Sequence, residues 1–248
     1  ERLLGVSLTG IMDCTLTNGK DDGLAERLER LRDVAVETNK IHAARIGIPQ
    51  SAAVTCVKPS GTVSQLVDSA SGIHARHNPY YIRTVRGDKK DPLAKAMIEA
   101  GFPVEDDVMK PEHTYVFSFP MKADNDSVFR DDMTALEQLE LWLTYQKSWC
   151  EHKPSVTISV KEHEWIEVGA WVYSNWEWMS GVSFLPFSDH TYRQAPYQDC
   201  TVEEYEAFLN KMPKGVDLNE ILANFEKSDQ TIGSQELACS GPDGCEII

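Results

Sequence analysis

The sequence predicts an α/β protein in which short strands alternate with helices along most of the chain. Segments rich in β-branched residues or with alternating apolar residues fit strands. These segments lie at 53–57, 80–86, 114–120, 155–160 and 181–187. Segments between them place apolar residues every three or four positions, which fits helices. Such alternation is typical of a parallel sheet, either in a barrel or in an open sheet, where loops at the carboxyl ends of strands hold the functional residues.

The first helix is expected over 21–46, where apolar residues recur at helical spacing until "GIP" at 47–49 ends it. The strand at 53–57 follows and leads into the turn "PSGT". The next letters, "VSQLV", predict the start of a second helix. After the strand at 80–86, Asp91 and Pro92 predict a helix start, because Asp caps a helix and Pro fits its first turn.

Four more helices are expected in the second half of the chain. They lie at 131–152, with an acidic first turn, and at 162–179, 201–212 and 217–226. Thr201 and Glu204 have the spacing of a capping box. From residue 227 onward the chain is polar and aperiodic, which predicts a mobile tail. We therefore expect an α/β part over 1–200, two helices over 201–226 and a flexible tail over 227–248.

Composition excludes several functions. The net charge of −15 at pH 7 repels phosphate backbones, so the chain is not expected to bind a nucleic-acid polymer. No apolar run approaches the roughly 20 residues of a membrane helix. There is no secretory signal, and the six cysteines do not form a dense framework, which predicts a cytoplasmic protein with reduced thiols. Because the chain begins at Glu1 in mid-pattern, we interpret residue 1 as a cut inside a longer chain.

The turn "PSGT" is a candidate anion site. Pro59, Ser60, Gly61 and Thr62 lie where a strand passes to an expected helix. The free N–H groups of a first helical turn, two hydroxyls and a glycine that permits close approach suit a phosphate. The alternative is an ordinary helix cap, since Ser and Thr are favoured there anyway. The spacing of a Walker A loop is missing.

A pair of cysteines near the end of the chain is a candidate redox site. Cys239 and Cys245 enclose "SGPDG", whose turn-forming residues can bring two sulfur atoms together. A dithiol on a polar tail suits thiol–disulfide exchange. Two idle thiols or half of a zinc site are the alternatives, although no further Cys or His lies nearby in the sequence.

The remaining suggestive residues are interpreted as structural. His74 and His77 are expected to line a polar loop or face solvent, and no metal site is expected. Four tryptophans at helical spacing are expected in the core or an interface: Trp165, Trp171, Trp176 and Trp178. Four cysteines in apolar or mixed surroundings are expected to be ordinary packed residues: Cys14, Cys56, Cys150 and Cys200.

Five segments together resemble the C-terminal part of ribonucleotide reductases, and the adenosylcobalamin-dependent (class II) ribonucleoside-triphosphate type most closely. They are "RLLGVSLTGIMD", "VTCVKPSGTVSQLVDSASGIHARHNPYYIRTVR", "VTISV", "GVSFLPFSDHTYRQAPY" and "ELACSGPDGCEI". The resemblance covers nearly the whole chain. It implies that 1–200 form the second half of a ten-stranded α/β barrel, followed by C-terminal helices and a mobile redox tail.

The resemblance also implies roles for particular residues. The substrate phosphates of a ribonucleoside triphosphate would rest on Pro59, Ser60, Gly61, Thr62, Val63 and Ser64. Cys239 and Cys245 would be the shuttle pair that takes electrons from thioredoxin or a similar dithiol donor. Adenosylcobalamin would start the reaction by generating a thiyl radical, which activates the ribose so that the 2′-hydroxyl leaves.

The chain departs from a complete reductase, because the family's Asn-x-Cys-x-Glu segment with the thiyl cysteine is absent from these residues. We therefore expect the chain to need a missing N-terminal part of the same enzyme and to be inactive alone. Two alternatives stay open. One is a non-catalytic nucleotide-binding α/β module with a redox-sensing cysteine pair, and the other is a thiol oxidoreductase that acts on proteins.

Overall fold

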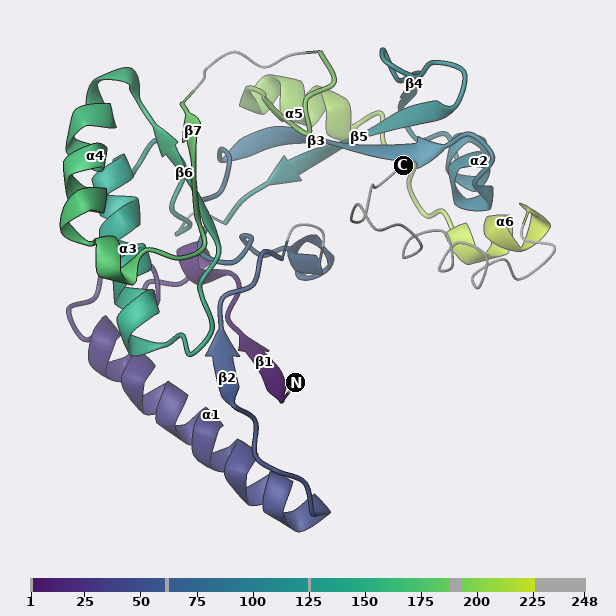
Figure 1. Ribbon diagram of the computed structural model, residues 1–248. Coiled ribbons are helices and arrows are strands. Elements are labelled where there is room, and N and C mark those ends of the chain that lie inside the picture. Colours follow the sequence, from purple (N-terminus) through teal and green to yellow (C-terminus); the bar gives the residue numbers. More distant parts are fainter. Residues whose placement is uncertain (1, 61–62, 125, 188–192, 226–248) are drawn as a thin grey trace. The chain divides into compact units, whose positions relative to one another are not determined.

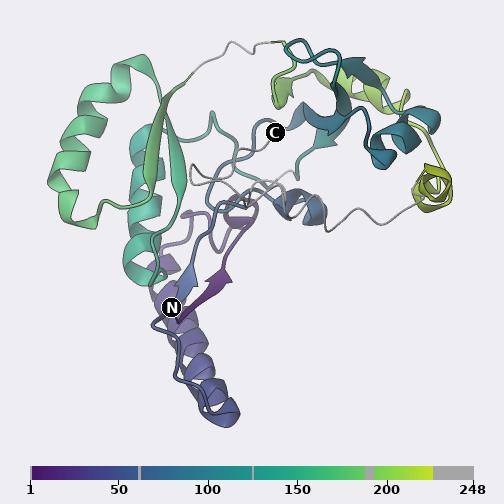
Figure 2. The ribbon, with the colours of Figure 1, turned by 45° about the vertical axis from the view of Figure 1, so that its right-hand side comes forward.

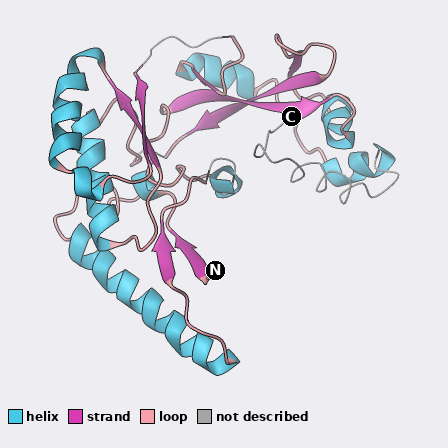
Figure 3. Ribbon diagram, in the orientation of Figure 1, coloured by secondary structure: helices cyan, strands magenta, loops and turns pink. Residues whose placement is uncertain are grey.

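A computed structural model describes residues 2–60, 63–124, 126–187 and 193–225 (Figure 1). They form two compact units, which are described separately. The first unit contains the described residues of Glu1–Tyr80 and Lys122–Thr191, and the second those of Tyr81–Met121 and Tyr192–Ile248. Both units combine helices with strands (Figure 3), so the α/β class is confirmed.

The first unit begins with a parallel pair of strands joined by a long helix. Strand β1 (Leu3–Ser7) pairs with β2 (Ala53–Cys56), and the connection contains the 3₁₀ helix η1 (Ile11–Asp13) and helix α1 (Leu24–Ile46). As predicted, α1 ends at Gly47, whose φ of 71° is left-handed and whose N–H bonds the last carbonyls. Strand β1 was not predicted, because all five of its residues are exposed and give no buried-strand pattern.

A second parallel pair completes this unit. Strand β6 (Val156–Val160) pairs with β7 (Val182–Pro186), and Figure 2 shows the two arrows side by side. Helix α4 (Trp165–Ser174) connects them, flanked by the 3₁₀ helices η3 (Glu162–Glu164) and η4 (Trp176–Trp178). The single helix expected over 162–179 was therefore wrong in detail, since Asn175 leaves the helical conformation and interrupts it.

Helix α3 (Ala135–Ser148) packs against β6 and α4 and supplies the centre of the core. It begins at Ala135 instead of 131, because Thr134 and Glu137 form a capping box that fixes the start. The aspartates expected in an acidic first turn therefore precede the helix. Trp142 is fully buried and donates its ring N–H to the carbonyl of Pro154 at 3.1 Å.

The second unit is built on a sheet with the strand order β4-β5-β3-β8. Its members are β3 (Tyr80–Asp88), β4 (Val104–Asp106), β5 (Thr114–Lys122) and β8 (Tyr197–Asp199). The pairs β4–β5 and β3–β8 are antiparallel, so the expectation of parallel strands throughout was wrong in this unit. Strands β4 and β8 were not predicted, because they have only three residues each.

Three helices complete the second unit, namely α2 (Pro92–Glu99), α5 (Val202–Leu209) and α6 (Leu218–Phe225). Two predicted caps are confirmed: Asp91 accepts a hydrogen bond from the N–H of Leu93, and Thr201 forms a capping box with Glu204. In the part of the chain that the structure describes, no helix has both the length and the apolar character needed to span a bilayer.

Candidate functional site

The predicted phosphate loop follows β2, in the first unit. Its first residues, Pro59 and Ser60, are described, whereas Gly61 and Thr62 lie outside the described residues. The segment that follows is a five-residue 3₁₀ helix, η2 (Val63–Val67), and not the α-helix that "VSQLV" predicted. A single short turn sums few peptide dipoles, so the contribution of a helix macrodipole is smaller here than expected.

Two backbone donors of this loop are already bonded within it. The N–H of Val63 donates to the carbonyl of Ser60 at 2.7 Å, and the N–H of Ser64 donates to the same carbonyl at 3.3 Å. These contacts tie the described residues on the two sides of Gly61 and Thr62 to each other. An anion bound here would therefore compete with the Ser60 carbonyl for both N–H groups.

The Ser60 hydroxyl belongs to a chain of three hydroxyls. Its oxygen lies 2.9 Å from Oγ1 of Thr9 and 3.2 Å from Oγ of Ser71. Thr9 donates to the carbonyl of Ala70 at 3.1 Å, so its single proton is used and Ser60 must be the donor to Thr9. Ser71 is then the donor to Ser60. In this arrangement the Ser60 proton is directed at the Thr9 oxygen.

A partly buried carboxylate anchors the segment that contains Ser71. Asp13, at the end of η1, accepts hydrogen bonds from the N–H of Ala70 at 2.6 Å and from Ser127 at 2.8 Å. Arg76 adds a two-point contact, with Nε at 2.9 Å from one carboxylate oxygen and Nη2 at 3.0 Å from the other. The Arg76 side chain is only 4% exposed and that of Asp13 14%.

The surroundings of Asp13 hold it in the charged form. Burial acts to raise the pKa of the carboxyl, but the hydrogen bonds from Arg76, Ala70 and Ser127 and the positive charge of Arg76 outweigh it, so the pKa lies below its usual value. Arg76 also donates to the backbone carbonyl of Asp68 at 2.5 Å and to its carboxylate at 3.1 Å. The charge of Arg76 is therefore neutralised inside the unit.

Through its ring, His74 connects the segment that contains Ser71 to strand β6. Its Nε2 accepts a hydrogen bond from the N–H of Thr157 at 3.0 Å, so that nitrogen carries no proton. Its Nδ1 lies 2.9 Å from the carbonyl of Ser71 and must be the protonated nitrogen. Of the two roles expected for His74, facing solvent is wrong and lining a polar loop is closer, since the residue is a neutral cross-link between two segments.

We expect this cross-link to make stability depend on pH. Burial lowers the pKa of His74, partly offset by its bond to Ser71, so the folded chain releases the proton more readily than the unfolded chain. The contribution of His74 is therefore complete above the unfolded pKa of about 6.5 and is lost as the pH falls below it. Thermal unfolding of the wild type and of His74→Gln should converge as the pH falls from about 7 to 5. Parallel curves over this range would contradict the assignment.

Of the four cysteines predicted to be packed residues, Cys56 is buried and Cys150 and Cys200 are half-buried, whereas Cys14, which directly follows η1, is exposed and the prediction is wrong for it. Burial raises the pKa of Cys56, which is 1% exposed at the end of β2, and raises that of Cys150 to about 12. Burial and nearby carboxylates also raise the pKa of Cys200. These thiols are protonated near neutral pH, so they are poor nucleophiles. Cys239 and Cys245 lie outside the described residues, and their redox role stays a prediction.

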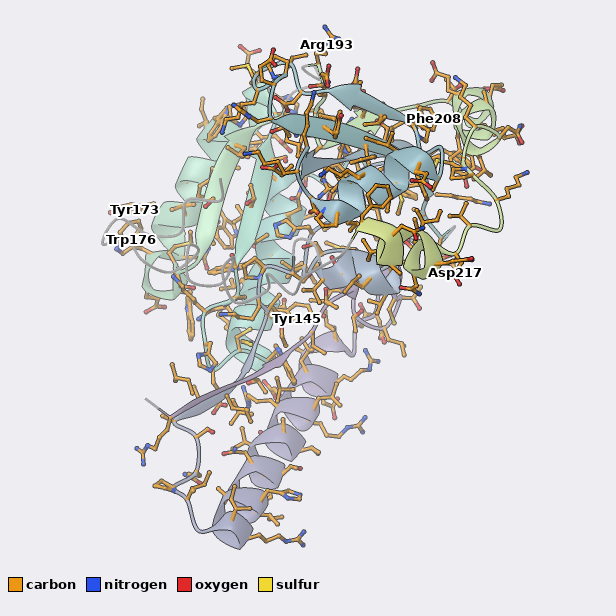
Figure 4. The ribbon with its side chains drawn as sticks, turned by 90° about the vertical axis from the view of Figure 1, so that its right-hand side faces the viewer. Tyr145, Tyr173, Trp176, Arg193, Phe208 and Asp217 are labelled. Atoms are coloured by element: carbon orange, nitrogen blue, oxygen red, sulfur yellow. The ribbon has the colours of Figure 1, made fainter. Side chains whose placement is uncertain are left out.

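The tryptophans that were predicted to lie in the core or an interface differ in their exposure. Trp171 packs against the core and donates to Glu140 at 2.6 Å, whereas Trp176 is 72% exposed and is not a core residue. Figure 4 shows Trp176 and Tyr173 projecting away from the ribbon of the first unit. Within the described residues, no cluster of three or more His, Cys, Asp or Glu side chains could hold a metal ion.

An open cavity of about 1170 Å³ lies at the N-terminal ends of α1 and α3. Several acidic side chains line it, but their local bonds explain them. Asp21 pairs with Arg27 and accepts from the N–H of Gly23, and Glu137 caps α3. Negative side chains are favourable at helix N-termini, so the acidic lining does not by itself indicate a cation site.

The residues that support the loop were not predicted from the sequence. Thr9, Asp13 and Ser71 lie inside the motifs that carry the family resemblance, but nothing in those motifs assigned them a role. Ser127 lies outside the motifs altogether. Thr9 follows β1 and Asp13 ends η1, but β1 itself was not predicted, so no sequence signal marked these residues.

Several known proteins are similar to this chain in sequence, and one solved structure is similar in fold. No family model matches the chain. The adenosylcobalamin-dependent ribonucleoside-triphosphate reductase of Euglena gracilis is 32% identical over 237 residues, which are 93% of this chain and 32% of that protein. The probable reductase of the same name from Dictyostelium discoideum is 30% identical over 89% of this chain, and the Lactobacillus leichmannii enzyme is 27% identical over 93%.

A solved structure agrees with these sequence matches. The crystal structure of a B-12 dependent (class II) ribonucleotide reductase superposes with a TM-score of 0.76, covering 91% of this chain and 35% of that one, at 23% sequence identity. At this identity the structure supports the fold alone. The chain spans about a third of the length of the curated relatives it matches. The resemblance predicted from the sequence is confirmed as homology to a segment of these reductases.

Proposed function

We propose that this chain, a homologue of a segment of the adenosylcobalamin-dependent ribonucleoside-triphosphate reductases, is the C-terminal part of such an enzyme. The whole protein would reduce ribonucleoside triphosphates to 2′-deoxyribonucleoside triphosphates. The observation that carries the proposal is the match over 93% of this chain to the Euglena enzyme. The proposal includes the cytoplasm as the location and the second half of a ten-stranded barrel as the fold of 1–200.

Within the reductase, the loop from Pro59 to Ser64 would hold the substrate phosphates. Its support is local: the loop follows the carboxyl end of β2, and a hydroxyl chain and a buried ion pair hold its surroundings. Because the Ser60 proton is directed at Thr9, phosphate contacts would fall to backbone N–H groups of the loop, and those of Val63 and Ser64 would have to leave the Ser60 carbonyl. Such groups bind anions well when they converge on one point.

The relatives are named for their dependence on adenosylcobalamin, and we extend this dependence to the protein that contains this chain. When bound, the cofactor supplies the radical that starts the reaction, through cleavage of its cobalt–carbon bond. His74 is not a candidate cobalt ligand, because both of its ring nitrogens face backbone groups. The work of this chain is to bind the triphosphate and to resupply electrons.

Electron resupply would fall to Cys239 and Cys245. Their two thiols would be oxidised to one disulfide, passing two electrons and two protons to the disulfide left by each turnover. Thioredoxin or a similar dithiol would then reduce the pair again. The thiyl cysteine and its partners would come from the part of the enzyme upstream of this chain.

The activity can be tested with a chain extended upstream to include the missing cysteine loop. We expect it to form deoxyribonucleoside triphosphates from ribonucleoside triphosphates only when adenosylcobalamin and a dithiol reductant are both present. The 248-residue chain alone serves as the matched control and should form no product, because it lacks the thiyl cysteine. Product would be measured by chromatography of the nucleotides.

Two outcomes favour other functions. Nucleotide binding without turnover in the extended chain would favour a non-catalytic α/β module whose cysteine pair senses redox state. Dithiol exchange with proteins that needs neither nucleotide nor cofactor would favour a thiol oxidoreductase. Full turnover without adenosylcobalamin would overturn the cofactor assignment while leaving ribonucleotide reduction in place.

A further inference from the structure

We propose that Asp13 is a positioning residue for the phosphate loop, and this inference rests on the proposed function of that loop. Asp13 has no hydrogen bond to Pro59, Ser60, Val63 or Ser64, the described residues of the loop. It holds the segment 68–76, and that segment in turn holds Thr9 and Ser60. The loop would thus be set in place by a partly buried carboxylate that reaches Ser60 through Ala70 and Thr9.

The first contact is the hydrogen bond from Ala70 to Asp13, which holds Ala70 in place. Its N–H donates to Asp13 at 2.6 Å, and its carbonyl accepts from the N–H of Gly10 at 2.8 Å and from the Thr9 hydroxyl at 3.1 Å. Asp13 therefore holds one side of this residue, and the strand-end residues Thr9 and Gly10 hold the other. Any shift of Ala70 must move the Thr9 hydroxyl as well.

The second contact passes from Thr9 to the loop. The Thr9 oxygen accepts from the N–H of Gly72 at 2.9 Å and lies 2.9 Å from the Ser60 oxygen. Ser71, between Ala70 and Gly72, supplies the other hydroxyl beside Ser60. Both neighbours of Ser60 therefore sit on the short stretch 70–72 or bond to it, and Asp13 anchors that stretch.

A carboxylate suits this role better than an amide. Asp13 accepts from the N–H of Ala70, from the Ser127 hydroxyl and from two nitrogens of Arg76. An asparagine would turn an NH₂ group toward at least one of these donors, and a buried donor facing a donor is costly. The exchange of one oxygen for nitrogen should therefore displace either Ala70 or Arg76.

The second unit offers a matched control. Asp107 is also buried, pairs with Arg86 at 2.7 Å, and accepts from the N–H groups of Met109 and Lys110. Its environment resembles that of Asp13 in chemistry, but its hydrogen bonds to Arg86, Met109 and Lys110 involve neither the phosphate loop nor the segment 68–76. A general loss of stability should appear in Asp107→Asn and Asp13→Asn alike, whereas a loss of phosphate positioning should appear in Asp13→Asn alone.

The test uses the full-length reductase chain that contains this segment, with CTP as the probe. We measure the dissociation constant for CTP by calorimetry without the cofactor, and KM and kcat for CTP with it. Asp13→Asn is expected to weaken CTP binding and raise KM about 10- to 100-fold, with a smaller change in kcat, because displaced contacts to the phosphates weaken ground-state and transition-state binding together. Asp107→Asn should leave the dissociation constant and KM unchanged.

The outcomes distinguish the proposed function from the positioning role. Failure of the wild type to bind CTP would overturn the proposed function. Binding by the wild type with equal affinity in Asp13→Asn, or an equal loss in Asp107→Asn, would overturn the positioning role alone. If Asp13→Asn does not fold, Ser127→Ala removes a single donor to the same carboxylate and should still raise the dissociation constant for CTP. An unchanged constant in that variant would also overturn the positioning role.

Discussion

Replacing Cys239 and Cys245 together by serine is expected to reduce thioredoxin-dependent deoxynucleotide formation by the extended chain to about one turnover per enzyme molecule. Each turnover consumes one dithiol, and without the shuttle pair the resulting disulfide has no route to the external reductant. The first turnover should be normal, because it draws on thiols already reduced. The measurement is product formed per enzyme, with thioredoxin and its reductase in excess.

Two controls make this result specific. A small dithiol such as dithiothreitol reaches buried disulfides directly and should restore multiple turnovers in the double variant. Cys200→Ser should behave as the wild type, because burial and nearby carboxylates raise the pKa of that thiol and make it a weak nucleophile. Unchanged thioredoxin-dependent turnover in the double variant would return Cys239 and Cys245 to the status of idle thiols.

The sequence correctly predicted the ends of those helices whose terminal residues form recognisable caps or stops. Asp91, Thr201 with Glu204, and Gly47 were predicted to be caps or stops, and each has that role in the structure. Local hydrogen bonds fix such ends, so a few neighbouring letters suffice to predict them. The same rule explains one error. The capping box of Thr134 and Glu137 was overlooked, and the start of α3 was placed four residues too early.

Elements without a local signal were missed. Strand β1 is exposed on all of its residues, and its pairing with β2 comes from a segment about 50 positions away. The alternation of strands and helices favoured a parallel sheet, but β4 and β5 form an antiparallel pair joined by a short connection. Periodicity reveals burial on one face and carries no information on the direction of the partner strand.

The candidate site shows the same difference between residues that have a local sequence signal and residues that only the fold brings together. The sequence singled out 59–62 as a candidate phosphate loop because two hydroxyls and a glycine follow a strand there, and the family resemblance extended it to Val63 and Ser64; the phosphate role stays a prediction. The residues that support the loop were not predicted, because in the sequence Asp13 is 57 positions from Ala70 and 114 positions from Ser127. An aspartate after a strand has many ordinary explanations, and only the fold brings its partners together. The residues that support a candidate loop are therefore harder to predict than the loop itself.

The largest effect on stability is expected for Trp142→Ala. Trp142 is fully buried in α3 and packs in the same cluster as Leu139 and Ile158, so alanine would leave a cavity that the surrounding chain fills only in part. The loss of the indole also leaves the carbonyl of Pro154 without its donor. Large-to-small changes of this kind cost about 3–5 kcal/mol. Since a domain is typically stable by only about 5–15 kcal/mol, this variant should be close to unfolding.

Trp176→Ala is the matched control, because it removes the same side chain from η4, where the indole is 72% exposed (Figure 4). Its cost should stay within about 0.5 kcal/mol. Equilibrium unfolding in urea, followed by far-ultraviolet circular dichroism, compares the two variants with the wild type. Trp142→Phe separates the two causes, since it keeps most of the apolar volume but loses the bond to Pro154. If Trp142→Phe were as unstable as Trp142→Ala, the hydrogen bond and not the packing would dominate at the centre of this core.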